Sequence, residues 1–219
     1  MIKGAEAVAA IAVVLALAGC APAVSPPSHT HAAAPTPAPS PSPTAPPTLS
    51  ELTLSPDGLG VLVIGSPVPK QSSSAAVVVW NPTQCDATSG AWLANYPSGP
   101  TIYGAGAPFV FDVNSKDEPL PYITILSPQI KTAAGISLGS TRDEVVAAYP
   151  RARVVSAEIS DLYVVDGTAG ELVIEIPKTS FDAGADANHV VDLYVALKSY
   201  PPGPTYQNDA GGRLCPGGS

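Results

Sequence analysis

Residues 49–219 are predicted to form an α+β fold built from antiparallel β-meanders and one short helix. Apolar and polar residues alternate in many short segments, which is the pattern of half-buried strands. Only one segment combines helical spacing with a start and a stop signal. Gly, Pro, Asp or Asn bounds most of the strand-like segments. The predicted strands are residues 60–65, 75–80, 109–113, 122–126, 152–157, 161–165, 171–176 and 190–197.

The helix is predicted to begin after Thr141. Thr141 and Glu144 have the spacing of a capping box, in which each side chain bonds the backbone amide of the other residue. Pro150 ends the helix because it lacks an amide hydrogen and clashes with the preceding turn. The apolar face of this helix consists of Val145, Ala148 and Tyr149.

The domain has two possible halves, residues 49–130 and 131–219, that resemble tandem repeats. "TIYGAGAPFVFDV" (101–113) aligns with residues 161–176, and "YITIL" (122–126) aligns with "LYVAL" (193–197). The first half departs from the pattern, because "SPVPKQSSS" carries two prolines where the second half has its capped helix.

The first 19 residues are predicted to be a signal peptide. Lys3 precedes an apolar run from Ala7 to Ala18, too short for a typical membrane-spanning helix. The run ends in Leu17, Ala18, Gly19 and Cys20, which resembles a bacterial lipobox. The resemblance implies that the Cys20 sulfur carries a diacylglyceryl group, with acyl chains such as palmitate, and that the chain is cleaved before Cys20. It also implies that the protein is anchored to the outer face of the cell membrane. The alternative is a plain secretory signal with a chance cysteine.

Residues 20–48 are predicted to be a disordered linker. Beyond Cys20, the segment consists almost entirely of Pro, Ala, Ser and Thr and holds no charged residue. Such a composition buries too little apolar surface to offset the entropy of ordering, and proline favours the extended polyproline II form. We expect a stalk that holds the domain away from the membrane.

Two cysteines remain after Cys20, at Cys85 and Cys215. In an exported domain they predict one disulfide, and two free thiols are the alternative. There is no CxxC and no Cys/His spacing of a zinc site.

The charge balance excludes nucleic acid as a partner. The chain carries 10 Lys and Arg against 18 Asp and Glu, a net charge of −8, and only Lys3 and Glu6 lie outside residues 49–219. An acidic surface repels phosphate backbones. We also expect no cofactor.

Ser137 lies in "GISLG" (135–139), which matches the G-x-S-x-G pattern of serine hydrolases. Asp161 or Asp166 and then His189 follow in the chain order of an α/β-hydrolase triad. However, the helix cap falls at Thr141, the approach to Ser137 is a polar loop, and the strands do not alternate with helices. We therefore interpret "GISLG" as a turn into the helix, with a serine hydrolase as the alternative.

Residues 136–150 are similar to a pattern of small bacterial envelope lipoproteins of the BamE (SmpA/OmlA-like) type. The later meander also resembles the helix-plus-sheet repeats of the β-lactamase inhibitory protein. The resemblance implies a non-enzymatic protein that scaffolds or binds other proteins. The residues that carry it are Ile136, Leu138, Gly139, Ser140, Thr141, Glu144, Val145, Tyr149 and Pro150.

Two acidic segments have partial metal-binding spacing. "DVNSKDE" (112–118) places Lys116 where a calcium loop needs an oxygen ligand, and it lacks the turn glycine. "FDAGADANH" (181–189) holds Asp182, Asp186 and His189 in one loop. We interpret both as solvated loops and expect no metal.

Trp92 and Tyr96 are the candidate binding residues. They lie in "SGAWLANYPSGP" (89–100), a Gly/Pro-bounded segment without strand alternation. Aromatic side chains on loops often anchor glycans or protein partners, and core packing is the alternative. We therefore expect a non-catalytic module that binds an envelope protein or cell-wall component, with a glycan or small-ligand receptor as another possibility.

Overall fold

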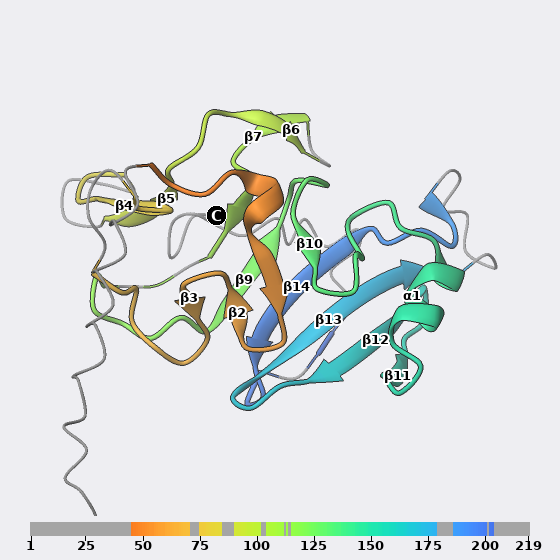
Figure 1. Ribbon diagram of the computed structural model, residues 1–219. Coiled ribbons are helices and arrows are strands. Elements are labelled where there is room, and N and C mark those ends of the chain that lie inside the picture. Colours follow the sequence, from red (N-terminus) through yellow and green to blue (C-terminus); the bar gives the residue numbers. More distant parts are fainter. Residues whose placement is uncertain are drawn as a thin grey trace, which may run out of the picture. The chain divides into compact units, whose positions relative to one another are not determined.

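The computed structural model describes residues 45–70, 75–84, 90–101, 104–111, 113, 115–178, 186–200 and 202–203 (Figure 1). Contacts divide the chain into Met1–Ser40 and Pro41–Ser219, and every described residue belongs to the second unit. The signal peptide, the lipobox, most of the linker and all three cysteines lie outside the described residues. Within the described ranges, no helix has the length and apolar character needed to cross a membrane.

The predicted α+β class is confirmed, and its centre is a six-stranded antiparallel sheet in the order β11-β12-β13-β14-β9-β8 (Figure 1). All the segments that form it were predicted as strands, because each alternates apolar residues. The strands are β8 (Phe109–Val110), β9 (Tyr122–Ile125), β11 (Arg153–Ser156), β12 (Ser160–Asp166), β13 (Gly170–Pro177) and β14 (Asp192–Leu197).

Shorter strands form three further sheets. β10 runs parallel to β1 in a four-stranded sheet of order β10-β1-β2-β3, and β4-β5 and β6-β7 are separate antiparallel pairs. A 3-10 turn, η1 (Leu49–Glu51), precedes β1. The strands are β1 (Thr53–Ser55), β2 (Gly58–Leu59), β3 (Leu62–Val63), β4 (Val78–Asn81), β5 (Ala91–Ala94), β6 (Gly99–Thr101), β7 (Gly104–Gly106) and β10 (Lys131–Thr132).

Six of these strands, namely β1, β2, β5, β6, β7 and β10, were not predicted. They are two to four residues long and, unlike the equally short β3 and β8, they do not lie within predicted apolar runs such as "GVLVIG" and "FVFDV". The polar loop expected before Ser137 in fact contains β10, and the segment of Trp92 contains β5. Pairing with distant partners, such as Thr53 with Lys131, creates these strands, and local sequence carries no signal of it.

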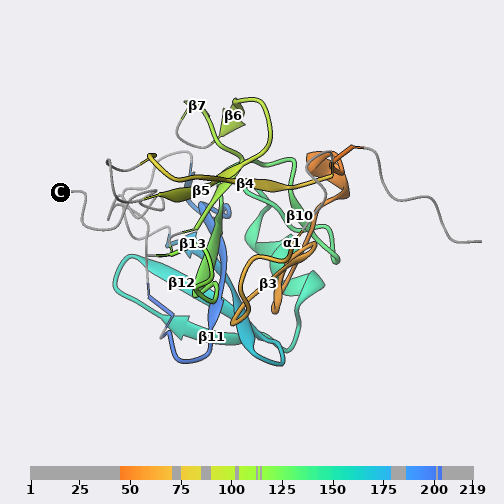
Figure 2. The ribbon, with the colours of Figure 1, turned by 90° about the vertical axis from the view of Figure 1, so that its left-hand side faces the viewer.

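The main core lies on one face of the six-stranded sheet. There, Tyr163, Leu172, Ile174 and Val195 pack in one cluster with the buried leucines of the four-stranded sheet and with the helix residue Val145. Accordingly, Figure 2 shows α1, β10 and β3 on the same side of the sheet. The second face carries a smaller cluster of Leu162, Val164, Val173, Tyr194 and Ala196.

The predicted helix is confirmed as α1 (Arg142–Ala148). The Thr141 amide donates to Glu144 Oε2 at 2.7 Å, and the Glu144 amide donates to Thr141 Oγ1 at 3.3 Å, so both halves of the capping box form. The helix ends at Ala148, and its C-cap Tyr149 stands directly before Pro150. Val145, on the face of the helix that packs on the core, is fully buried.

Asp57 joins the four-stranded sheet to the six-stranded sheet. Its Oδ1 accepts the amides of Ala169 at 2.8 Å and Gly170 at 3.2 Å, in the turn between β12 and β13. Backbone hydrogen bonds from Thr168 and Ala169 lower the pKa of Asp57. Because Asp57 and Ala169 are far apart in the sequence, this contact fixes the β1–β2 turn against the β12–β13 turn, and the local sequence pattern did not predict it.

The two predicted halves pair with each other at two places, β1 with β10 and β9 with β14. The register pairs Ile123 with Val195 and Thr124 with Tyr194. If the two halves were related by a two-fold axis between β9 and β14, Ile123 would correspond to Tyr194 and Thr124 to Val195. The predicted alignment of residues 122–126 with residues 193–197 gives the same correspondence. However, among the described strands β7 pairs with β6 alone, whereas its aligned counterpart β12 pairs with both β11 and β13. The repeat stays a prediction.

Candidate functional site

The candidate binding residues Trp92 and Tyr96 lie partly buried against the main core. Trp92 on β5 faces Trp80 on β4 across the strand pair, and their rings meet edge to face with centroids 5.5 Å apart. Trp92 Nε1 is buried without a hydrogen-bond partner, the only such side-chain atom among the described residues. This packing favours the core role that the sequence left open for Trp92, and its binding role stays a prediction.

Tyr96 is held by contacts on two sides. Its hydroxyl donates to the Pro47 carbonyl at 2.9 Å, and its ring packs edge to face on Phe109 at 6.1 Å. Burial, followed by the charge of Glu51, raises the pKa of Tyr96. Tyr96 therefore fastens the start of the domain to β8.

Ser137 lies in a turn between β10 and α1, where the flanking Gly135 and Gly139 have φ of +86° and +82°. Its amide donates to Ser140 Oγ at 3.1 Å. Asp161 bonds Arg142 and Ser156, while His189 Nδ1 lies 3.0 Å from the Ala187 carbonyl. No hydrogen bond among the described residues links Ser137, Asp161 and His189.

The structure describes only part of the two acidic segments, residues 112–118 and 181–189, that have partial metal-binding spacing. Asp112, Asn114 and Asp182 lie outside the described residues, and Lys116 is exposed. Within the described ranges, no three His, Cys, Asp or Glu side chains are grouped so that they would hold a metal ion.

An Arg142-centred network, which the sequence analysis missed, fixes α1 on the sheet. The Arg142 guanidinium donates to Asp161 Oδ2 at 2.8 Å, the Tyr163 hydroxyl at 3.0 Å and Asn188 Oδ1 at 3.2 Å. Burial opposes the ionisation of Asp161, but hydrogen bonds from Ser156 and Arg142 outweigh burial and lower its pKa. Lys178 also lies 3.8 Å from Asp161.

We expect Arg142→Lys to lower the free energy of unfolding by roughly 2 kcal/mol, because lysine keeps the charge but loses the planar fork that reaches three acceptors. Urea unfolding followed by tryptophan fluorescence measures the change. Arg151→Lys, on the exposed turn after α1, is the matched control and should change the unfolding free energy by less than about 0.5 kcal/mol. Equal losses in the two variants would contradict a stabilising role for this network.

Buried carboxylates on the second face of the sheet were also missed. Glu175 on β13 and Asp192 on β14 are directly paired across the strands, and Ser160 Oγ donates to Glu175 Oε1 at 2.6 Å. Burial and then the charge of Glu175 raise the pKa of Asp192 to about 7. The available signal was a pair of acidic residues four positions apart, and so on one face of an otherwise apolar strand, as in "ELVIEI".

The surface best suited to a partner is formed by α1, the turn after it, and β11; we call it the α1–β11 surface. Val146 on α1 is 47% exposed and Val154 on β11 is 53% exposed, among the highest values for large apolar side chains in the described chain. A hollow of about 370 Å³ lies at the C-terminal end of α1 and the turn that follows it. Its lining is Ala148, Tyr149, Pro150, Arg151, Ala152, Val165 and Asp166.

The exposure of Val154 follows from the arrangement of α1 and β11. α1 lies over β12, as the contacts of Arg142 with Asp161 and Tyr163 show, and β11 is the edge strand beyond β12. Val154 is paired with Tyr163 and therefore points to the same face of the sheet as α1, but beyond the cover that the helix provides.

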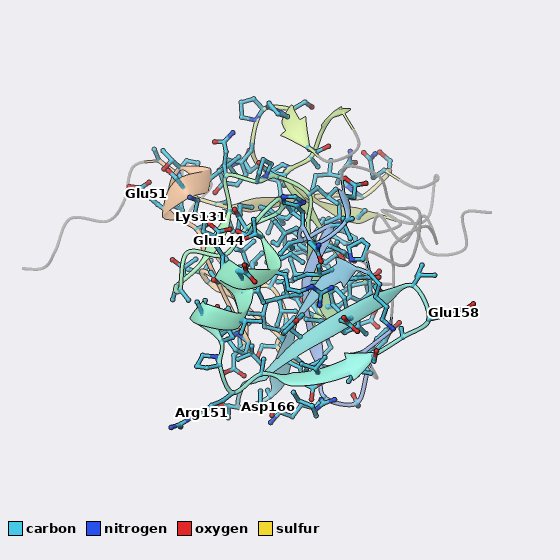
Figure 3. All side chains as sticks on the ribbon, turned by 90° about the vertical axis from the view of Figure 1, so that its right-hand side faces the viewer. Glu51, Lys131, Glu144, Arg151, Glu158 and Asp166 are labelled. Carbon is cyan, nitrogen blue, oxygen red and sulfur yellow. The ribbon has the colours of Figure 1, made fainter. Side chains whose placement is uncertain are left out.

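Charged residues border the α1–β11 surface in groups (Figure 3). Lys131 lies near Glu144 on one side. Hydrogen bonds from Thr141, followed by the charges of His189 and Lys131, lower the pKa of Glu144. Arg151 and Glu158 lie at opposite ends of β11. The surface thus combines exposed apolar side chains with a charged border, which is the composition of many protein interfaces.

No family model, curated protein or solved structure matches the chain. The BamE-like resemblance of residues 136–150 therefore stays an interpretation of the motif. In the structure, this motif is the turn and α1, the segment that builds the α1–β11 surface.

Proposed function

We propose that the chain is a membrane-anchored extracytoplasmic lipoprotein whose domain is a non-catalytic binding module of the cell envelope. The observation that carries the proposal is the run of Leu17, Ala18, Gly19 and Cys20 directly after an apolar segment. Two acyl chains on Cys20 would bury enough methylene groups for stable anchoring. The charge-free, proline-rich linker that follows would let the domain reach away from the membrane.

The α1–β11 surface supports the binding role. Val146 on α1 and Val154 on β11 are exposed, and a hollow lies at the turn that joins these two elements. Apolar side chains around a hollow, bordered by charged residues, are typical of protein-binding surfaces. The Arg142 network and the capping box hold α1 in one position, so the surface is rigid before a partner arrives. Preorganisation of this kind lowers the entropy lost on binding.

Cys20→Ala should release the protein from the membrane fraction, because lipid attachment requires the Cys20 sulfur. Fractionation of expressing cells and labelling with a radioactive fatty acid would measure the change, with Cys85→Ala as the matched control that retains the lipid. Full membrane retention of Cys20→Ala would overturn the anchor.

Binding through the α1–β11 surface is tested in the same cells by replacing Val146 with a photo-crosslinking amino acid and detecting crosslinked proteins. We expect a discrete crosslinked protein from Val146, and none from the control position Val79, which is 40% exposed on β4. Identical products from both positions, or none from either, would contradict binding through the α1–β11 surface.

A further inference from the structure

We propose that the C-terminal segment of the chain, residues 204–219, lies across the second face of the six-stranded sheet and is anchored at its start by the hydroxyl of Tyr194. Residues 204–219 lie outside the described part of the chain. The inference does not depend on the proposed function, because Val154 and α1 of the α1–β11 surface lie on the opposite face of the sheet.

The second face is buried, although the described elements provide no layer that covers it. Leu162, Val164 and Val173 are each at most 1% exposed, and they form one cluster with Tyr194 and Ala196. Every described residue in this cluster, or packed against it, belongs to a strand of the sheet itself. An uncovered sheet face meets water, whereas β13 is buried at all eight positions. A segment from outside the sheet must therefore cover this face.

The chain turns back onto the second face directly after β14. The Tyr200 amide donates to the Leu197 carbonyl at 2.7 Å, which closes a tight turn. The Tyr200 ring then packs on Tyr122 of β9, with the ring centroids 5.9 Å apart. Tyr122 is paired with Ala196, a member of the second-face cluster, so this ring contact lies on the second face.

Tyr194 holds the following residues on the same face. Its hydroxyl donates to the Gly203 carbonyl at 3.1 Å, and the Gly203 amide donates to this hydroxyl at 3.3 Å. Because Tyr194 precedes Ala196 on β14, the chain from Tyr200 to Gly203 runs back along β14 over the second face. Residues 204–219 therefore start on the face that needs a cover.

The segment is long enough to cover the cluster. Residues 204–219 can reach about 50 Å when they are fully extended. The sheet measures about 20 Å from β9 to β11, since neighbouring strands lie about 4.8 Å apart. The segment can therefore cross the face from β14 to β11 and return.

Composition and charge favour this segment over a second copy of the chain. Tyr206 and Leu214 supply large apolar side chains, and the charges of Asp209 and Arg213 cancel. The second face is apolar and also holds buried carboxyl groups of β13 and β14. A neutral segment adds no repulsion there, whereas a second chain would bring a net charge of −8. Attachment to β14 also gives the segment a high effective concentration at the face.

Photo-crosslinking in the full-length protein tests the placement. A diazirine analogue of leucine in place of Leu162 should crosslink to a peptide from residues 204–219, because Leu162 points to the second face. The matched control is the same analogue in place of Leu172, which is equally buried at 0% exposed but points to the main core. The control should give no crosslink to residues 204–219.

The identity of the crosslinked peptide decides between the occupants. A mixture of isotopically heavy and light chains separates crosslinks within one chain from crosslinks between two copies. Products of Leu162 with residues 179–185, with a second copy or with another protein, and none with residues 204–219, would overturn the proposal. Products confined to the strands of the sheet would overturn it as well.

Trypsin cleavage of the folded, full-length protein tests the anchor at Tyr194. Arg213 is the only Lys or Arg within residues 204–219, so cleavage after it reports how often the segment leaves the sheet. Tyr194→Phe should raise the rate of this cleavage roughly fivefold, because both hydrogen bonds to Gly203 are lost. Tyr163→Phe removes a hydroxyl from the opposite face and should leave the rate unchanged. Equal rates in the two variants would overturn the anchoring role of Tyr194.

Discussion

Asp192→Asn should stabilise the protein above neutral pH by up to about 4 kcal/mol and have little effect below about pH 4. Asp192 lies on β14 opposite Glu175 and is buried on the second face of the sheet. Burial and then the Glu175 charge raise its pKa to about 7. Asparagine removes the charge but keeps the oxygen that accepts the Leu193 amide at 2.8 Å.

The sign follows from proton binding. An unfolded aspartate has a pKa of about 3.9, so between about pH 4 and pH 7 the folded protein holds a proton that the unfolded chain releases. Asp192 therefore contributes its full stability below this window, and the contribution is lost as the pH rises through about 7. Asp57 and Asp161 have lowered pKa values and act in the opposite sense, losing their contributions as the pH falls.

Urea unfolding at several pH values measures this difference, with tryptophan fluorescence as the signal. The difference in unfolding free energy between wild type and Asp192→Asn should grow from about pH 4 to about pH 7 and then level off. Asp117→Asn, in the exposed turn at residues 115–118, is the matched control and should track wild type. A constant difference across the pH range would show that burial of Asp192 does not couple to proton binding.

Gly58→Ala should lower the free energy of unfolding by about 3 kcal/mol or more, through steric overlap added to backbone strain. Gly58 has a φ of +150°, and an added Cβ would lie 2.0 Å from the Leu62 carbonyl oxygen. Gly58 pairs with Ser55 on one side and Val63 on the other. Because the clash is with backbone, relief requires β2 and β3 to separate, which exposes the fully buried Leu62.

Gly135→Ala is the control that separates strain from overlap. Gly135 also has a positive φ, +86°, but an added Cβ there meets no atom within 4 Å. Its cost should be about 1 kcal/mol, since only the backbone preference changes. Thermal and urea unfolding of both variants measure the difference, and equal losses would show that the close approach of β2 and β3 does not matter.

Local pattern was sufficient where an element contains its own signals. All eight predicted strands overlap observed strands, and the capping box of Thr141 and Glu144 forms as predicted. These signals are contacts between residues a few positions apart, or alternation along one segment. The turn at Gly135 and Gly139 belongs to the same class, because glycine at positive φ is a local requirement.

The candidate site could be predicted only in part. Its helix and the valines of "ARVVSA" were visible in the sequence, but nothing local shows that β11 is an edge strand or that α1 stops short of covering Val154. The Arg142 network joins residues that lie far apart along the chain, from Asp161 to Asn188. The exposure of Val154 and the long-range contacts of Arg142 both depend on how the strands are ordered in the folded sheet.

By itself, the sequence determined the α+β class, the capped helix and the segments of all six strands of the large sheet, because periodicity and caps act within a few residues. It also supports the predictions of a lipid anchor and a proline-rich linker, since both depend on local composition. Only the tertiary structure decided the order β11-β12-β13-β14-β9-β8, the joining of both halves between β9 and β14, and the placement of Glu175 beside Asp192. These features depend on which distant strands pair, and burial of apolar surface over the whole domain selects that pairing.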